Sequence, residues 1–98
     1  MAPHPGHLEI EEQIYRAVRT VKPSLAVVPM SPETRFENLG LTSLDFITVV
    51  FEIEDAYGLS IVEQRLDTFR TVAEARDVVA RLLAAMPGGN QHLAEEAG

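Results

Sequence analysis

The stretch that decides the fold is Leu39-Gly40-Leu41-Thr42-Ser43-Leu44-Asp45-Phe46, together with the residues after it as far as Gly58. The hydroxyl of Thr42 can accept a hydrogen bond from a backbone N–H that is unpaired in a first helical turn. Asp45, three residues later, can reach back to the cap and meet the positive end of the helix dipole. Gly58 tolerates the left-handed conformation that often closes a helix. The sequence therefore predicts a helix over residues 43–57, with Ser43 in its first turn.

This helix has two apolar faces when its residues are placed at about 100° per step. The face predicted to enter the core consists of Phe46, Val49, Val50, Ile53 and Tyr57, with Ala56 beside them. The opposite face carries an apolar row, Leu44, Ile47 and Phe51, among Asp45, Thr48, Glu52 and Asp55, with Glu54 at its flank. An exposed apolar row rimmed by acids indicates a surface that binds a protein partner. The alternative is that a second element covers the row, so that the helix is buried on both sides.

Two more helices are predicted from apolar residues at helical spacing. The first covers residues 8–21, with the stripe Ile10, Ile14, Ala17, Val18 and Val21, while Glu11 and other charged residues cover its remaining surface. The last begins after Thr71, which forms a capping box with Glu74. Its stripe consists of Val72, Ala75, Val79 and Leu82, with Val78 and Leu83 at the margins.

The connections between these helices contain their own apolar anchors. Residues 23–42 form a long connection whose apolar residues, Phe36 foremost, are expected to plug the ends of the bundle: Leu25, Val27, Val28, Met30, Phe36, Leu39 and Leu41. After Gly58 we expect an extended loop and one short helical turn over residues 63–66, with Leu59, Ile61, Leu66 and Phe69 buried. The chain of 98 residues is one domain, which we divide into a flexible tail (1–7), a helical domain (8–85) and a second flexible tail (86–98).

Composition excludes several classes of function. The net charge of −7 argues against nucleic acid and anionic membranes, and it suits basic protein partners. The chain has no cysteine, and His4 and His7 have no ligand partner at metal-binding spacing, so no metal site is predicted. No apolar stretch can span a bilayer, and the N-terminus lacks the features of a signal peptide, so we expect a cytoplasmic protein. The acids lie on solvated helix faces rather than in a shared cleft, which argues against carboxylate catalysis.

Ser43 is not expected to act as a nucleophile by itself. A serine needs a base to take its proton, and the three histidines, at positions 4, 7 and 92, lie in the predicted tails. Ser43 is better interpreted as a hydroxyl that another enzyme modifies. A phosphate on this residue would lie at a helix N-terminus, where free N–H groups and the dipole favour an anion.

The run Phe36-Glu37-Asn38-Leu39-Gly40-Leu41-Thr42-Ser43-Leu44-Asp45 resembles the phosphopantetheine attachment motif of acyl carrier proteins, which reads Leu-Gly, a variable residue, then Asp-Ser-Leu. The resemblance covers about residues 8 to 84. It implies an all-α four-helix bundle of three longer helices and one short helix, with a long first loop. It also implies 4′-phosphopantetheine, transferred from coenzyme A onto Ser43, whose thiol holds acyl or aminoacyl groups as thioesters. One departure is Thr42, which replaces the usual Asp that is implied to help the modifying transferase place its metal ion.

The resemblance predicts a discrete acyl carrier protein that is not an enzyme and is a monomer. Its partners would be a phosphopantetheinyl transferase, a loading ligase, and acyltransferases or synthases with basic docking patches. Fatty-acid, modified-lipid, polyketide, non-ribosomal peptide and aminoacyl routes share this plan, and Thr42, Phe51 and Arg65 favour a specialised route. In docking, apolar contact would come from Leu44, Ile47 and Phe51, and charge from Asp45, Glu52, Glu54 and Asp55. A space for a fatty chain would be lined by Phe46, Val50, Ile53 and Phe69.

Two other hypotheses remain open. One is a carrier-like interaction module that is never loaded, with Thr42 as the mark of lost modification. The other is a small helical regulatory or toxin–antitoxin-type protein that binds a basic partner and does not depend on Ser43. Arg65 and Arg70 lie where the resembled family often carries acids, and they are either solvated or retune which partner docks.

Overall fold

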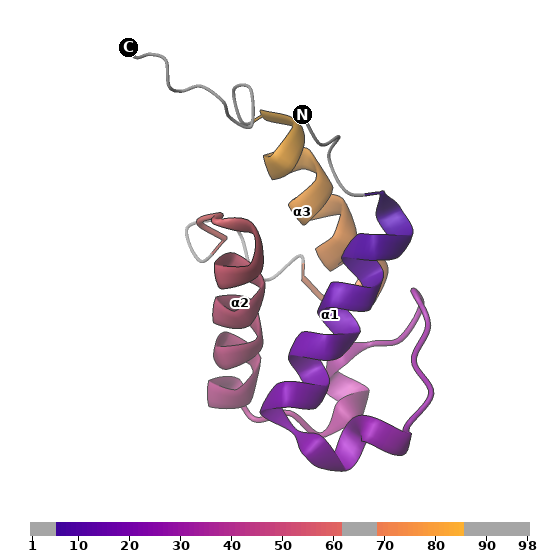
Figure 1. The fold of residues 1–98 in the computed structure, drawn as a ribbon. Coiled ribbons are helices and arrows are strands. Elements are labelled where there is room, and N and C mark those ends of the chain that lie inside the picture. The colour runs from indigo at the N-terminus through magenta and orange to yellow at the C-terminus, as the bar shows by residue number, and fades with distance from the viewer. Residues whose placement is uncertain (1–5, 62–68, 86–98) are drawn as a thin grey trace.

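Three helices make up the body of the computed structural model, which describes residues 6–61 and 69–85. They are α1 (His7–Val21), α2 (Ser43–Tyr57) and α3 (Val72–Ala85), and the connection between α1 and α2 contains two 3₁₀ turns, η1 (Pro23–Val27) and η2 (Phe36–Leu39). Helix α1 packs against both α2 and α3 (Figure 1). The predicted all-α fold with three longer helices and a long first connection is confirmed. The short helical turn predicted at residues 63–66 and most of both predicted tails lie outside the described residues.

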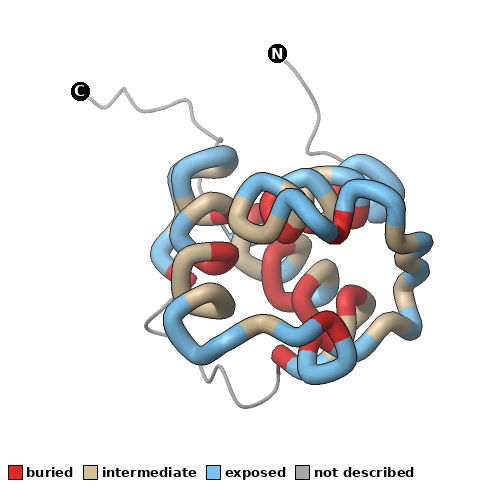
Figure 2. The backbone as a smooth tube through the Cα atoms, turned by 90° about the horizontal axis from the view of Figure 1, so that it is seen from below, coloured by how far each residue is buried: buried red, intermediate tan, exposed pale blue. Residues whose placement is uncertain are grey.

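The core is built from one stripe on each helix, and the buried segments face one another across the interior (Figure 2). The stripes predicted for α1 and α2 are confirmed, although Val21, Phe46 and Tyr57 are only partly buried and Ala56 is exposed. In α3 the prediction placed Leu82 in the stripe, but Leu83 is the buried residue and Leu82 is half-buried. The stripe that packs on the core continues from Val79 to Leu83, one full turn later, which leaves Leu82 at the margin.

The first half of the long connection is held against α1 by Arg19. Its guanidinium donates hydrogen bonds to the carbonyl oxygens of Leu25 (3.3 Å) and Val28 (3.1 Å). Leu25 is buried as predicted, but the expected anchor Val27 is 89% exposed, so that prediction is wrong. In a turn with three residues per revolution, Val27 points to the side away from Leu25, and only one of the two can enter the core.

The second half of the connection pairs with the segment just before α3. Arg35 and Thr71 form an isolated antiparallel bridge. The Phe36 N–H donates to the Arg70 carbonyl, and the Val72 N–H donates to the Thr34 carbonyl, each at 3.0 Å. This pairing was not predicted, because no pattern in the sequence indicates it. It fixes Phe36 beside the start of α3 and brings segments that are distant in sequence to the N-terminal end of α2.

An ion pair links α1 to α3 inside the structure. Arg76 donates to the carboxylate of Glu11 at 2.6 Å, and the two side chains are 20% and 11% exposed. Hydrogen bonds to Glu11 and then to Asp77 raise the pKa of Arg76 above its usual value. The prediction that Glu11 lies on the solvated surface of the first helix is wrong, because α3 covers that part of α1.

Candidate functional site

The N-terminus of α2 forms a fixed corner that presents Ser43. The Asp45 N–H donates to the Thr42 hydroxyl (3.0 Å), and the Thr42 N–H donates back to the Asp45 carboxylate (3.1 Å), so the predicted capping box is confirmed. Gly40, at φ 72°, makes the left-handed turn that leads into this cap. Ser43 is the first residue of the helix and is exposed, and its hydroxyl makes no hydrogen bond with any residue in the described ranges.

A cleft of about 480 Å³ lies beside Ser43. Its inner wall is aromatic: Phe36 and Phe69 are only 4% and 3% exposed, and Phe46 is half-buried. The ring of Phe36 lies 5.6 Å from that of Phe46 and 6.3 Å from that of Phe69, and Phe46 and Phe69 are 6.0 Å apart, measured between centroids. The described residues that line the cleft are Phe36, Glu37, Leu41, Thr42, Ser43, Phe46, Ile47, Phe69 and Arg70.

Of the four residues predicted to line a space for a fatty chain, two line this cleft. Phe46 and Phe69 line it, whereas Val50 and Ile53 do not and are completely buried in the core. The sequence reasoning missed Phe36 as a lining residue, since it assigned Phe36 only a plugging role. The cleft therefore ends at the three phenylalanine rings and does not reach the deeper part of the core.

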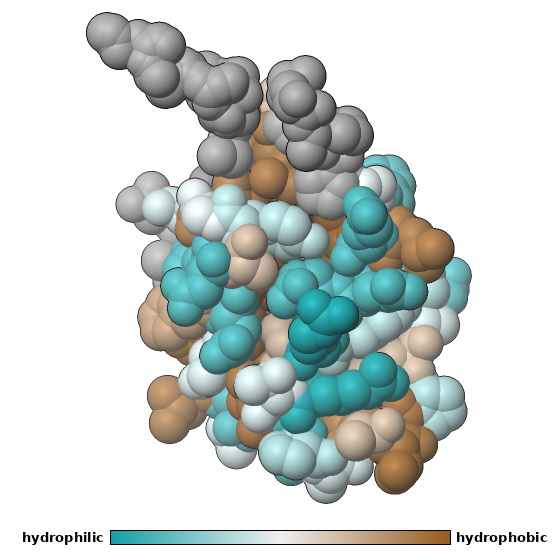
Figure 3. All heavy atoms as spheres, viewed as in Figure 1, coloured by the Kyte–Doolittle hydropathy of each residue, from teal (hydrophilic) through white to brown (hydrophobic). Residues whose placement is uncertain are grey.

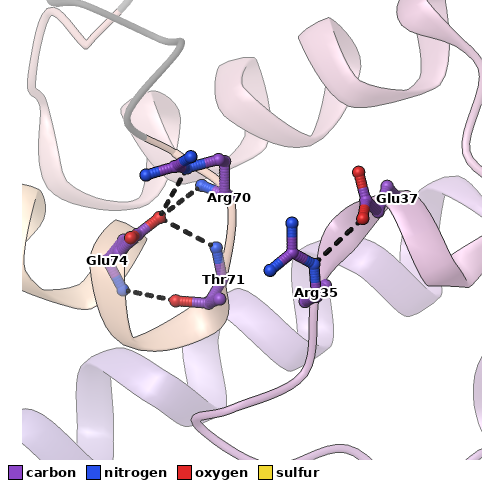
Figure 4. Close-up of polar contacts among 5 residues, drawn as sticks. All are labelled: Arg35, Glu37, Arg70, Thr71 and Glu74. Carbon is purple, nitrogen blue, oxygen red and sulfur yellow. Dashed lines mark hydrogen bonds and ion pairs between the residues drawn. The ribbon is translucent and has the colours of Figure 1, made fainter.

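Charged residues border the cleft on one side, where the paired segments meet (Figure 4). Glu37 accepts from Arg35 at 2.9 Å. The Glu74 carboxylate accepts from the backbone N–H groups of Arg70 (2.8 Å) and Thr71 (3.3 Å), and the Thr71 hydroxyl accepts from the Glu74 N–H (3.1 Å), which confirms the second predicted capping box. Among the residues that the structure describes, the guanidinium of Arg70 makes one long ionic contact, with Glu74 at 3.8 Å.

The outer face of α2 carries the predicted apolar row. Leu44 is 75% exposed and Phe51 is 47% exposed, while Ile47 is partly buried because it also lines the cleft. Apolar side chains gather along the edge of the molecule where α2 runs (Figure 3). The alternative in which a second element covers the row does not occur among residues 6–61 and 69–85, since the two ends of the row remain exposed.

The acids predicted to rim this row differ in their surroundings. Asp55 is exposed, whereas Asp45 and Glu52 are partly buried, and Asp45 belongs to the capping box. Glu54 accepts a hydrogen bond from the Ile61 N–H at 2.6 Å, which ties the end of α2 to the segment that follows it. This structural contact was not apparent in the sequence. In the part of the chain that the structure describes, no three His, Cys, Asp or Glu side chains are grouped in a way that could hold a metal ion, and no helix is long and apolar enough to cross a membrane.

Comparison with known proteins gives one matching family model and several relatives. The model, described as "Phosphopantetheine attachment site", matches residues 16–82. Acyl carrier protein 2, chloroplastic, of Spinacia oleracea is 30% identical over 74 residues, which cover 72% of this chain and 57% of that protein. Acyl carrier protein 4, chloroplastic, of Arabidopsis thaliana is 30% identical over 79 residues, 78% of this chain and 58% of that protein. Acyl carrier protein 4, chloroplastic, of Cuphea lanceolata is 31% identical over 75 residues, 74% of this chain and 54% of that protein. The chain thus spans somewhat over half the length of these relatives, and no solved structure gives a significant match.

Proposed function

This chain belongs to the family of phosphopantetheine-binding carrier proteins, whose members carry groups rather than catalyse reactions, and from that premise we propose that Ser43 is the residue that holds the cofactor. The observation that supports this most directly is the position of its hydroxyl. It is exposed at the first residue of α2, beside an apolar cleft, and makes no hydrogen bond with a described residue.

The residues around Ser43 fit 4′-phosphopantetheine. Its phosphodiester would lie at the N-terminus of α2, where free backbone N–H groups and the helix dipole favour an anion. The cleft offers apolar walls from Phe36, Phe46 and Phe69 to the organic part of the arm or to its cargo. When bound, the cofactor supplies a terminal thiol that holds a carried group as a thioester. The chain itself contributes the capped N-terminus of α2, which holds Ser43 and can bind an anion, and an apolar cleft beside it.

We propose an acyl group as the cargo, rather than an aminoacyl group. The inner wall of the cleft consists of three phenylalanine rings, and burial of an apolar chain against such a wall is favourable, by about 0.8 kcal/mol for each methylene. A free amino group would be desolvated against these rings, and Glu37, the carboxylate at the border of the cleft, is already paired with Arg35. A specialised biosynthetic route remains part of the proposal, supported by Thr42 next to the attachment residue and by the exposed Phe51 on α2.

We further propose that partner enzymes dock on the outer face of α2. Leu44, Ile47 and Phe51 would make the apolar contacts, and Asp45, Glu52, Glu54 and Asp55 would face basic groups of a phosphopantetheinyl transferase or an acyl-handling enzyme. The net charge of −7 supports this, because a field of one sign raises the rate of encounter with an oppositely charged partner. The cytoplasmic location and the monomeric state remain predictions.

Intact mass spectrometry tests the attachment residue. The protein is incubated with coenzyme A and a broad-specificity phosphopantetheinyl transferase, alongside Ser43→Ala and the control variant Ser60→Ala, which alters another exposed serine. We expect one phosphopantetheine on the parent and on Ser60→Ala, and none on Ser43→Ala. Loading of Ser43→Ala, or no loading of a folded parent by several transferases, would refute the proposal. The second outcome would favour the interaction module that is never loaded.

A further inference from the structure

Arg70 is the cation that borders the cleft beside Ser43. Of the described residues that line the cleft, only Glu37 and Arg70 are charged, and Glu37 is already paired with Arg35 at 2.9 Å. Helix α2 contributes no cation, since residues 43–57 contain neither Lys nor Arg. Among the described lining residues, an anion placed on Ser43 therefore has Arg70 as its basic neighbour along the cleft.

The guanidinium of Arg70 is available for such an anion. Its side chain is 67% exposed, and its ionic contact within the described ranges is the 3.8 Å approach of Nε to Glu74. The Glu74 carboxylate is held independently, because it accepts from the backbone N–H groups of Arg70 and Thr71 (Figure 4). The backbone of Arg70 is fixed as well, since its carbonyl accepts from the Phe36 N–H. The residue is thus anchored at its main chain while its charged end can turn toward the cleft.

The chemistry of the cofactor matches this position. A phosphodiester carries one negative charge, and on Ser43 it would join a chain of net charge −7 close to the carboxylate of Asp45. Like charges at such a site are unfavourable unless a cation compensates them. Arginine suits this purpose because its planar guanidinium can bind two phosphate oxygens at once.

We propose that Arg70 pairs with the phosphodiester on Ser43 and thereby directs the cofactor arm into the cleft instead of across the outer face of α2. Arg70 is a positioning residue in this role, since it would hold the arm without touching the thiol. The inference rests on the proposed function, because it requires Ser43 to carry the cofactor. The pair would join α2 to the segment before α3 across the mouth of the cleft.

The test uses protein that intact mass has shown to be fully loaded, so that a failure of loading is recognised before the arm is examined. The variants are Arg70→Gln, which removes the charge, and Arg70→Lys, which keeps it. Arg81→Gln is the matched control, because Arg81 is an exposed arginine on α3 that does not line the cleft. Two quantities are measured: the ³¹P chemical shift of the phosphodiester, and the rate at which a neutral maleimide alkylates the terminal thiol.

We expect Arg70→Gln to move the ³¹P resonance toward that of a small phosphodiester free in solution. The same variant should raise the alkylation rate about two- to tenfold, the range expected for a partly exposed charge-assisted pair. Arg70→Lys should lie between the parent and Arg70→Gln, and Arg81→Gln should match the parent. The difference between the parent and Arg70→Gln should vanish in about 1 M salt, where the Debye length is about 3 Å. If Arg70→Gln matches the parent in both measurements, or if Arg81→Gln has the same effect as Arg70→Gln, the pairing is refuted even though loading succeeds. If Ser43 is not loaded, the proposed function has failed and this inference fails with it.

Discussion

Removal of the Thr42 hydroxyl should loosen the corner that presents Ser43. In the variant Thr42→Ala the hydrogen bond from the Asp45 N–H (3.0 Å) is lost, while the bond from the Thr42 N–H to the Asp45 carboxylate (3.1 Å) involves only the backbone of residue 42 and can remain. One of the two bonds of the capping box is thus removed. Loss of an N-cap side chain typically lowers the free energy of unfolding by about 1 kcal/mol, within a range of roughly 0.5–2 kcal/mol.

Thr42→Asp is the matched variant. Aspartate is at least as good as threonine at an N-cap, and its charge interacts favourably with the helix dipole, although the nearby Asp45 carboxylate opposes it. We therefore expect the free energy of unfolding of Thr42→Asp to stay within about 0.5 kcal/mol of the parent. Because this variant restores the acid that usually precedes the modified serine in the family, it should also be loaded faster by a phosphopantetheinyl transferase.

Circular dichroism at 222 nm during thermal and urea unfolding measures the stability of all three proteins. For a domain of this size a loss of 1 kcal/mol lowers the melting temperature by about 4–8 °C. Thr42→Ala should therefore melt about 5 °C below the parent, and Thr42→Asp should melt near it. The initial rate of mass gain with coenzyme A and transferase measures loading under conditions where all three proteins remain folded.

Two results would contradict this account. If Thr42→Ala melts at the temperature of the parent, the capping box contributes nothing to the stability of α2. If Thr42→Asp is as stable as the parent but is loaded no faster, the absence of an acid at residue 42 does not limit modification. If a variant loses both stability and loading, the slower loading can be a consequence of unfolding. The aspartate variant is needed because it should change loading without changing stability.

Two more predictions concern the ion pair and the docking face. Glu11→Gln should lower the free energy of unfolding by about 1–3 kcal/mol, because Arg76 keeps the exposed Asp77 but loses the charged partner that is mostly covered. Urea unfolding measures this, and additive losses in the double variant with Arg76→Gln would show that Glu11 and Arg76 do not interact. Leu44→Ser should raise the KM of the transferase for the carrier roughly tenfold, since a buried leucine contributes about 1.5–3 kcal/mol. The control is Leu8→Ser, which alters another exposed leucine, 67% exposed and on α1, and an equal effect there would rule out a specific docking role for Leu44.

Elements whose signals are local in sequence were predicted with their boundaries. Helix α2 begins after Thr42 and ends at Gly58, where φ is 66°, because the cap, the acid at the third position and the closing glycine all lie within the segment itself. The same holds for the cap of α3 at Thr71 and Glu74. Such contacts depend on residues three or four positions apart, so periodicity and capping rules suffice to identify them.

Features that depend on distant residues were missed or misplaced. Glu11 looks like a surface acid because its partner, Arg76, lies 65 positions away in sequence. The bridge between Arg35 and Thr71 pairs one residue from each segment, so neither segment shows the alternating pattern that would predict a strand. Val50 was expected to line the cleft. In the packed structure three phenylalanine rings form the inner wall of the cleft, and Val50 lies completely buried in the core.

The two surfaces beside Ser43 meet at one side chain. Ile47 belongs to the apolar row on the outer face of α2 and also lines the cleft, together with Phe46, its neighbour in sequence. A partner that covers the row must therefore touch a wall of the cleft, and a shift of Ile47 on docking would change the space available to the arm. Under the proposed function, a partner bound to the row would therefore also contact a wall of the space offered to the arm, because Ile47 belongs to both surfaces.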